Sequence, residues 1–249
     1  MKIFRKLRIE AVQLDSAKRY LLYAVGEIVL IVVGILIAVN INNWNERNKS
    51  LKLQLKTLKE IKAALLLDVA DLRLNIELHQ EAIRACGALL EVFKKDQNYH
   101  DTLSYYFAKA FWSSRFISKS GPYETLKSRG IELITNDDLR NEITDVYDRA
   151  YENLLKVEGT MADYIQHVML SFNPDHFDKT EMFSATHPES IGIMKPMDFE
   201  KLKENKKYHH LLRTFRSSSE LFVTFNYQST IEMTEKLIAS IEREIAQLE

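Results

Sequence analysis

The sequence predicts an all-α protein, with one N-terminal transmembrane helix followed by an elongated antiparallel helical bundle that contains a long stalk helix. Three observations predict this class. The chain of 249 residues contains only 7 Gly and 4 Pro, so turns are scarce. Residues Tyr20 to Ile41 include a single ionisable side chain, Glu27. After this stretch, apolar residues recur at helical spacing along most of the chain.

The stretch from Tyr20 to Ile41 predicts a membrane-spanning helix. At about 1.5 Å per residue it reaches roughly 33 Å, enough to cross a hydrocarbon core of about 30 Å. A cleaved signal peptide is the alternative, but the run is longer than a typical signal core and no small-x-small cleavage site follows it. We therefore expect an uncleaved anchor. It divides the chain into a basic amphipathic tail (1–19), the span (20–41) and a bundle domain (42–249).

The charges that flank the span predict its topology. The tail carries six Lys and Arg residues against two acidic ones, which favours a cytoplasmic N-terminus under the positive-inside rule. Residues 47–59 carry nearly as many positive charges, so the asymmetry is small, although a long domain translocates largely regardless of its charge. In a bacterium, the bulk of the chain would then be periplasmic.

A heptad pattern follows the span. Its regularity without an internal proline predicts one helix of some 45 residues packed against partner helices. Nothing between Ile41 and Leu51 breaks a helix, so this helix is expected to continue directly from the span. Eleven of the thirteen seam positions are apolar; the seam consists of Leu51, Leu55, Leu58, Lys62, Leu65, Val69, Leu72, Ile76, His79, Ile83, Cys86, Leu90 and Phe93.

Capping and turn residues predict the remaining helices. Asp101 can cap a short aromatic helix, and Pro122 and Gly130 bracket another one. Three of the four prolines fall in residues 171–196, where the helical period disappears, so we expect an irregular segment there. Three further helices are predicted: from a cap at Thr135 or Asn136 to about Leu170, from Asp198 to Leu212, and a last one after the serine run 217–219.

Composition and motifs exclude several classes of function. Lys and Arg number 34 against 35 Asp and Glu, and Cys86 is the only cysteine. The charge balance gives no support for a nucleic-acid partner, and one cysteine excludes an intramolecular disulfide. The sequence contains no HExxH, GxSxG, Gly-rich phosphate loop or paired-cysteine motif. We therefore expect neither an enzyme nor a cofactor.

Two segments carry a resemblance to a known family. The segment from Tyr23 to Asn45, which includes GEIVLIVVGILIAVNINNWN, resembles the N-terminal signature of domain-of-unknown-function family 6090, a single-span family common in Bacteroidota. The segment YETLKSRG (123–130), followed by ITNDDLR (134–140), resembles the middle motif of that family. The resemblance covers nearly the whole chain. It implies a bacterial envelope protein and carries no known activity. Together with the predicted span, we expect a single-pass protein of the bacterial inner membrane.

One face of the span is the first candidate site. Glu27 shares a helical face with Ile31, Gly34 and Ala38. Gly34 and Ala38 form a small-xxx-small pair, which lets two helix backbones approach closely. An ionisable residue inside a span usually faces a partner or a cavity. The pattern predicts self-association, with Glu27 paired across the interface or protonated; a Glu27 that reaches lipid headgroups, Lys18 or Arg19 is the alternative.

The irregular segment is the second candidate site. Its carboxylates and imidazoles could hold a divalent metal, although their spacing matches no established ligand pattern and a solvated loop supplies the same residue types. These residues are Asp175, His176, Asp178, Glu181 and His187. The aromatic group 105–112 could line a ligand groove, although bundle core is the favoured interpretation.

The sequence therefore predicts a non-enzymatic envelope interaction or scaffold protein, oligomeric through its transmembrane helix. Its expected partners are the lipid bilayer and either a second copy or another envelope membrane protein. Two alternatives remain. One is a ligand-sensing periplasmic bundle, whose short cytoplasmic tail would require a signalling partner, and the other is a metal-dependent envelope enzyme.

Overall fold

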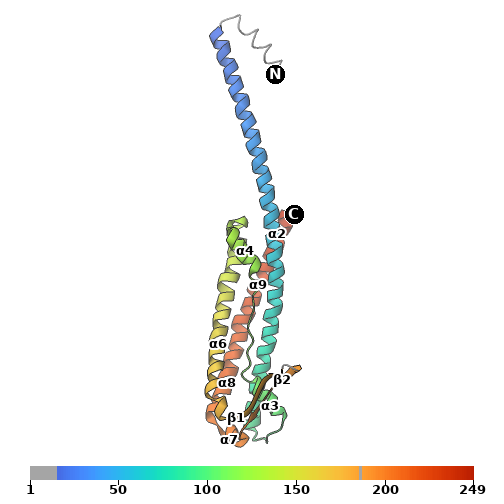
Figure 1. The fold of residues 1–249 in the computed structure, drawn as a ribbon, viewed down its shortest axis with the longest axis vertical. Coiled ribbons are helices and arrows are strands. Elements are labelled where there is room, and N and C mark those ends of the chain that lie inside the picture. Colours follow the sequence, from blue (N-terminus) through green and yellow to red (C-terminus); the bar gives the residue numbers. More distant parts are fainter. Residues whose placement is uncertain (1–15, 185–186) are drawn as a thin grey trace. The chain divides into compact units, whose positions relative to one another are not determined.

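The structure is a computed structural model that describes the backbone of residues 16–184 and 187–249 and the side chains of residues 20–178 and 192–249. The predicted amphipathic tail thus lies almost wholly outside the described residues. Helices dominate the described chain (Figure 1). In chain order the elements are α2 (Ser16–Lys94), α3 (Thr102–Lys109), α4 (Gly121–Arg129), η2 (Ile131–Leu133), α5 (Asp137–Thr144), η3 (Asp145–Tyr151), α6 (Glu152–Ser171), η4 (Asn173–Asp175), β1 (Phe177–Ser184), β2 (His187–Pro196), α7 (Phe199–Glu204), α8 (Lys206–Phe222), η5 (Val223–Tyr227) and α9 (Gln228–Leu248).

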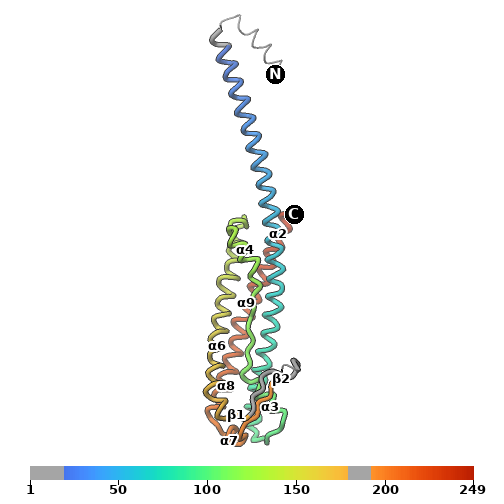
Figure 2. The backbone as a smooth tube through the Cα atoms, viewed as in Figure 1, coloured from blue at the N-terminus to red at the C-terminus, as the bar shows by residue number. Residues whose placement is uncertain are grey.

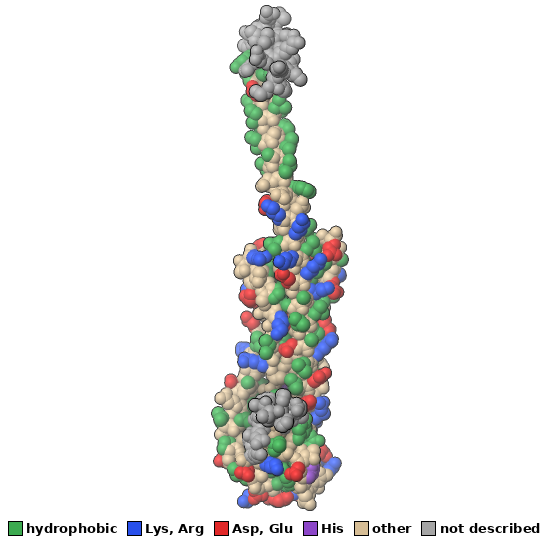
Figure 3. Space-filling view, turned by 45° about the vertical axis from the view of Figure 1, so that its right-hand side comes forward, with side chains coloured by type: hydrophobic (Ala, Val, Ile, Leu, Met, Phe, Trp, Pro, Cys, Tyr) green, Lys and Arg blue, Asp and Glu red, His purple; other side chains and the backbone are tan. Residues whose placement is uncertain are grey.

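Helix α2 is unbroken over 79 residues, which confirms that the predicted span and the predicted heptad helix are continuous. Contacts divide the chain into a unit that ends at Gln54 and a compact unit from Leu55 to Glu249. The first unit contains an apolar 18-residue window with a mean hydropathy of 2.7, none of which is buried. Figure 3 shows hydrophobic side chains along this part of α2. The helix is thus long and apolar enough to cross a membrane.

Three long helical rods build the second unit. They are the part of α2 after Gln54, the α5–η3–α6 rod and the α8–η5–α9 rod (Figure 1). The third rod runs antiparallel to α2, because residues early in α2 pair with residues late in α9. Three ion pairs fix this register: Lys59 with Glu249 at 2.6 Å, Lys62 with Glu242 at 3.2 Å, and Arg73 with Glu235 at 2.6 Å. The predicted antiparallel bundle is confirmed for these two rods.

The heptad seam of α2 faces the core as predicted. None of its thirteen residues is exposed, and Leu58, Leu65 and Leu72 are completely buried. The core forms two clusters: one contains Leu58 to Leu72 of α2, and the other contains Ala82 to Phe93 with the aromatic residues of α3. Phe107 and Phe111 belong to the second cluster, so the predicted core role of these aromatics is confirmed. His79 is buried on α2 between the stretches that build the two clusters.

An extended segment connects α3 to α4 and lies along the bundle (Figure 2). Residues 113–120 have no regular secondary structure, and we call residues 116–119 the strap. Phe116 at its start is 2% exposed and packs edge-on against Tyr151, with ring centroids 4.9 Å apart. Phe116 is buried and the strap has no sheet partner, so its N–H groups require other acceptors. The acceptors are side-chain carboxylates from α2 and α6, described below.

Residues 171–196 are more ordered than the sequence predicted. They contain the short helix η4 and an antiparallel hairpin in which Phe177 pairs with Pro196 and Glu181 with Ile193. The prolines did not exclude strands, because both strands of a two-stranded hairpin are edge strands and Pro196 stands at a strand end. The hairpin packs mainly against α3.

The serine run 217–219 does not separate two helices, contrary to the prediction. Helix α8 begins at Lys206, passes through the run and continues through the π-helical segment η5 into α9. The actual break is at Asn205, whose side chain accepts a hydrogen bond from the Tyr208 N–H at 3.1 Å and caps α8. Ser219 is completely buried, so it acts as a small packing residue within a helix that tertiary contacts hold in place.

The YETLKSRG and ITNDDLR segments flank the turn between α4 and α5. The first forms most of α4 and ends at Gly130, and the second leads into the start of α5. Gly130 ends α4 with φ of 101°, a conformation that residues with a Cβ rarely adopt. Asn136 caps α5 by accepting a hydrogen bond from the Leu139 N–H at 3.1 Å, and its amide donates to Glu244 of α9 at 2.6 Å. Tyr123 is buried and stacks on Tyr147, with ring centroids 4.4 Å apart. These segments therefore hold the turn in place.

Replacement of two glycines by alanine is expected to have opposite effects on stability. The variant Gly130→Ala should lower the free energy of unfolding by about 1 to 2 kcal/mol, because a Cβ strains the positive φ. The matched control Gly159→Ala, inside α6 with nothing within 4 Å of the added Cβ, should raise it by about 0.5 to 1 kcal/mol. Urea unfolding of both variants measures the two effects. Equal destabilisation would contradict the assigned backbone conformation.

Candidate functional site

The four residues predicted to mediate association share one face of the span. Their spacing of four, three and four residues on an unbroken helix brings Glu27, Ile31, Gly34 and Ala38 to one side. All four are exposed, and a Cβ built at Gly34 meets nothing within 4 Å. This face therefore leaves room for the close approach of another helix.

The predicted metal-ligand residues are not gathered into a site in the part of the chain that the structure describes. Asp175 and Asp178 are exposed, and the side chains of Glu181 and His187 lie outside the described residues. His176 stacks on Phe172 with ring centroids 3.8 Å apart, and its Nδ1 lies 2.9 Å from the Phe172 carbonyl. Its Nε2 lies 3.0 Å from the amide of Asn205. Both imidazole nitrogens thus join the η4 turn to the cap of α8, and among described residues no group of three metal-ligand side chains occurs.

Three acidic side chains hold the strap, and we call Asp68, Asp71 and Glu158 the carboxylate clamp. The Phe116 N–H donates to Glu158 Oε1 at 2.9 Å, and the Ile117 N–H donates to Asp71 Oδ2 at 3.1 Å. The Lys119 N–H donates to Asp68 Oδ1 at 2.7 Å. Hydrogen bonds from backbone N–H groups to carboxylates are strong. The clamp therefore replaces the sheet partner that the extended strap lacks.

The buried end of the clamp continues into an aromatic cluster. The Tyr227 hydroxyl of η5 donates a hydrogen bond to Glu158 Oε1. Next to it, His79 packs against Tyr227 and Phe222, with ring centroids 5.4 Å apart in both pairs. His79 is 1% exposed, and neither ring nitrogen has a hydrogen-bond partner among the described residues. This group joins α2, α6 and η5 at the middle of the bundle.

Burial raises the pKa values of two clamp carboxylates and lowers the pKa of the neighbouring His79. Desolvation raises the pKa values of Asp68 and Glu158, although the hydrogen bonds that they accept oppose the shift. Desolvation lowers the pKa of His79 to about 4. Perturbed pKa values often mark catalytic sites. Here both carboxylates with raised pKa values accept hydrogen bonds from the strap, so their arrangement accounts for how the strap is held against the bundle.

Sequence reasoning missed the clamp. Asp68 falls between Leu65 and Leu72 of the seam, on the face of α2 that is buried. An aspartate three residues after one core leucine and four before another is a signal for a buried carboxylate that requires partners. The partners themselves lie about 50 residues away in the strap, so no local pattern identifies them.

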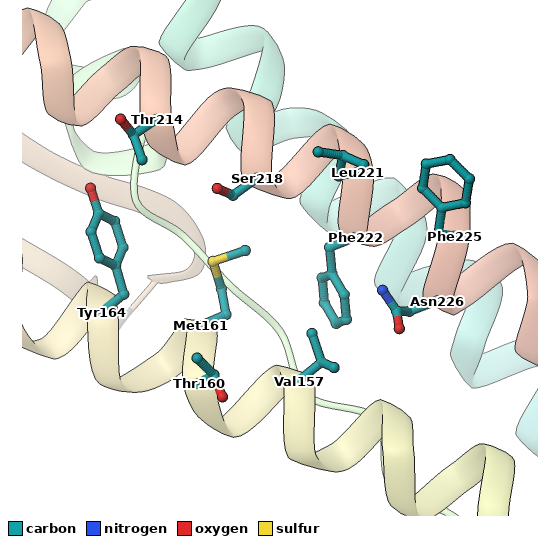
Figure 4. Close-up of a pocket in the computed structure, with 10 residues that line it drawn as sticks. All are labelled: Val157, Thr160, Met161, Tyr164, Thr214, Ser218, Leu221, Phe222, Phe225 and Asn226. Carbon is teal, nitrogen blue, oxygen red and sulfur yellow. The ribbon is translucent and has the colours of Figure 1, made fainter.

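A groove lies between α6 and the α8–η5 part of the third rod (Figure 4). Its volume is about 450 Å³. None of the three clamp residues lines it, and one lining residue, Phe222, packs against the His79 ring. Ten residues line the groove: Val157, Thr160, Met161, Tyr164, Thr214, Ser218, Leu221, Phe222, Phe225 and Asn226.

Comparison with protein families identifies the family of the chain. The profile of DUF6090, a family of unknown function, matches residues 27–182. The chain belongs to this family. The match confirms the resemblance that the two sequence segments indicated. Comparison with curated proteins and with solved structures finds no match.

The matched residues show which features the family profile covers. They include most of the span, the carboxylate clamp and the turn that contains Gly130 and Asn136. They end within β1, so α8, η5 and α9 lie beyond the match. The α6 side of the groove therefore lies inside the matched region and the α8 side outside it.

Proposed function

We propose that this DUF6090 member is a non-enzymatic interaction protein of the bacterial envelope, anchored in the inner membrane by the first part of α2. The observation that carries this proposal is the exposed apolar surface between Tyr20 and Ile41, because most of its large side chains are more than 45% exposed. Such a surface is stable when lipid covers it. The compact unit after Gln54 would be the part that meets partners.

The proposed topology places the N-terminus in the cytoplasm and the compact unit in the periplasm. The basic tail supports this orientation, and the length of the domain permits translocation. In this topology, the compact unit would meet other periplasmic proteins or the periplasmic parts of membrane proteins.

Self-association through the face of Glu27, Gly34 and Ala38 is the proposed mode of interaction. Small residues let helix backbones pack closely, and a polar side chain in the membrane gains a hydrogen bond from a partner helix. An exposed stripe later in α2 supports the same mode. Ala63, Leu67, Ala70 and Leu74 recur at heptad spacing, and the two leucines are 58% and 53% exposed.

A bulky residue at Gly34 is expected to disrupt the proposed oligomer. The variant Gly34→Ile should reduce crosslinking between two copies in native membranes at least about tenfold, because the added side chain separates the backbones. The matched control is Gly26→Ile, which makes the same change about 80° round the helix. Sedimentation of both variants in detergent provides a second measurement. A strictly monomeric wild-type protein, or equal crosslinking of both variants, would refute self-association through this face.

A ligand-sensing bundle is the second candidate function. The observation that favours it is the groove between α6 and α8, which is lined by Met161, Phe222 and Phe225 among others. Thermal-shift measurements with neutral amphiphiles test this candidate. No stabilisation by any of them would remove it.

A further inference from the structure

We propose that Trp44 and Arg47 of α2 dock in the head-group layer of the bilayer, where Arg47 binds the phosphate of an anionic phospholipid. The inference rests on the proposed membrane anchor and names the class of lipid that this anchor binds. It concerns only the first unit of the chain, which ends at Gln54. It also gives a role to the positive charges that follow the span, which the proposed topology leaves unexplained.

Two exposed aromatic residues mark the ends of the apolar run. Tyr20 stands at its start and Trp44 just past its end, and each is 67% exposed. Their separation along the unbroken helix corresponds to about 36 Å. A hydrocarbon core is about 30 Å thick, and the bilayer measures about 40 to 45 Å with its head groups. When the run is centred in the bilayer, both rings therefore fall in the interfacial layers, where Trp and Tyr are enriched in membrane proteins.

The residues around Trp44 suit the same layer. After Trp44 no large apolar side chain follows until Leu51, so contact with hydrocarbon ends within a few residues of Trp44. Exposed amide side chains surround this point, and they can exchange hydrogen bonds with water, ester carbonyls and phosphates of the interface. The exposed asparagines are Asn40, Asn42, Asn43 and Asn45.

Arg47 is the first cation after the span. It follows Trp44 by three residues, which adds about 4.5 Å of helical rise. Side chains of an α-helix lean toward its N-terminus, and for Arg47 this direction leads back toward the bilayer. The guanidinium therefore reaches the depth of the lipid phosphates, where its planar fork can donate two hydrogen bonds to one phosphate.

The charge of Arg47 is available to a lipid. Arg47 is exposed and forms no ion pair with any residue that the structure describes, whereas Lys49 pairs with Glu46 at 2.9 Å. Lys52 is likewise exposed without an ion pair among those residues, so this flank keeps a net positive charge. Anionic lipids attract cations close to the membrane surface, over a Debye length of about 8 Å. Charge complementarity therefore selects an anionic phospholipid over a zwitterionic one.

Fluorescence of Trp44 in phosphatidylcholine vesicles tests the docking depth. The chain contains two tryptophans, so the variant Trp112→Phe serves as the background, and circular dichroism establishes that it is folded. Brominated lipids quench an indole that lies at the depth of the bromine. We expect lipids brominated near the head group to quench Trp44 at least about twofold more than lipids brominated near the chain ends. The reverse order would overturn the proposed depth, whereas no quenching by either lipid would refute the membrane anchor itself.

Electron paramagnetic resonance with spin-labelled lipids tests the choice of lipid. The full chain is placed in phosphatidylcholine vesicles, and the immobilised fraction of spin-labelled phosphatidylglycerol is compared with that of spin-labelled phosphatidylcholine. We expect phosphatidylglycerol to associate at least about threefold more strongly at low salt. This preference should fall as salt is added, because exposed charges are screened. Equal association of the two lipids would overturn the proposal and leave the membrane anchor intact.

Two matched variants assign the phosphate to one side chain. Arg47→Gln and Lys52→Gln each remove one positive charge from an exposed position, so neither should disturb folding. Lys52 lies about 7.5 Å farther along the helix than Arg47, beyond the head groups. Arg47→Gln should reduce the preference for phosphatidylglycerol at least about twofold, and Lys52→Gln should reduce it less than half as much. Equal reductions would show a diffuse attraction by net charge and would overturn the site at Arg47.

Discussion

Replacement of Glu158 by alanine is expected to destabilise the compact unit by about 3 kcal/mol. The substitution leaves the Phe116 N–H and the Tyr227 hydroxyl without their shared acceptor, and both are buried. Each buried donor that loses its partner costs about 1 to 3 kcal/mol. The relief of a buried charge offsets part of this cost. Urea unfolding followed by circular dichroism measures the result.

The variant Glu158→Gln is the matched control. Its carbonyl oxygen can accept both hydrogen bonds, but its amide nitrogen replaces Oε2, which is buried without a partner among the described residues, so we expect a loss of about 1 to 2 kcal/mol, smaller than that of the alanine variant. Adding Tyr227→Phe to Glu158→Ala removes one orphaned donor and should recover about 1 kcal/mol. If the alanine and glutamine variants were equally stable, the clamp would not hold the strap through Glu158.

The heptad helix could be predicted because the residues that define its buried face lie close together in the sequence. Spacing of three and four residues identifies the buried face of α2, and every seam residue is at least partly buried. The turn between α4 and α5 could be predicted for the same reason. Gly130 and Asn136 reveal their roles through residue chemistry alone, since few residues tolerate a positive φ or cap a helix.

The aromatic helix shows where local chemistry is insufficient. Asp101 precedes α3 as predicted, but its side chain makes no capping hydrogen bond. Its backbone carbonyl instead accepts from the Ser104 hydroxyl at 2.6 Å. Packing of Phe107 and Phe111 into the second core cluster places this helix, so its position was predictable and its cap was not.

The features that sequence reasoning missed depend on distant contacts. The clamp joins residues of α2 and α6 to a strap that has no pattern of its own. The hairpin forms between strands whose residues do not alternate regularly, and it packs on α3 far away in the chain. The groove is a space between two helices, so it depends on their packing and no motif encodes it. Tertiary contacts routinely override local propensity in this way.

Replacement of His79 by leucine is expected to change how stability depends on pH. The pKa of His79 falls from 6.5 in the unfolded chain to about 4 in the folded protein. Between these values the unfolded state binds a proton that the folded state does not. Acidification through this window therefore destabilises the wild type through His79, by about 3 kcal/mol at pH 4. The leucine variant lacks this loss.

Two of the three clamp carboxylates, Asp68 and Glu158, act in the opposite sense. Their pKa values are raised in the folded protein, so the folded state retains protons that the unfolded state has already released. Acidification through this range therefore stabilises the fold by their contribution. In the wild type this gain masks part of the loss at His79. Subtraction of the wild-type pH profile from that of His79→Leu cancels the carboxylate contribution and isolates the histidine.

The difference between the two unfolding free energies should therefore grow by about 3 kcal/mol from pH 7 to pH 4. At pH 7, the leucine variant should already equal or exceed the wild type, because it removes two buried ring nitrogens that have no hydrogen-bond partner. Urea titrations at several pH values in an uncharged detergent measure the stability difference at pH 7 and its growth toward pH 4. A difference that does not change with pH would mean that His79 titrates alike in both states, and would contradict its burial between Phe222 and Tyr227.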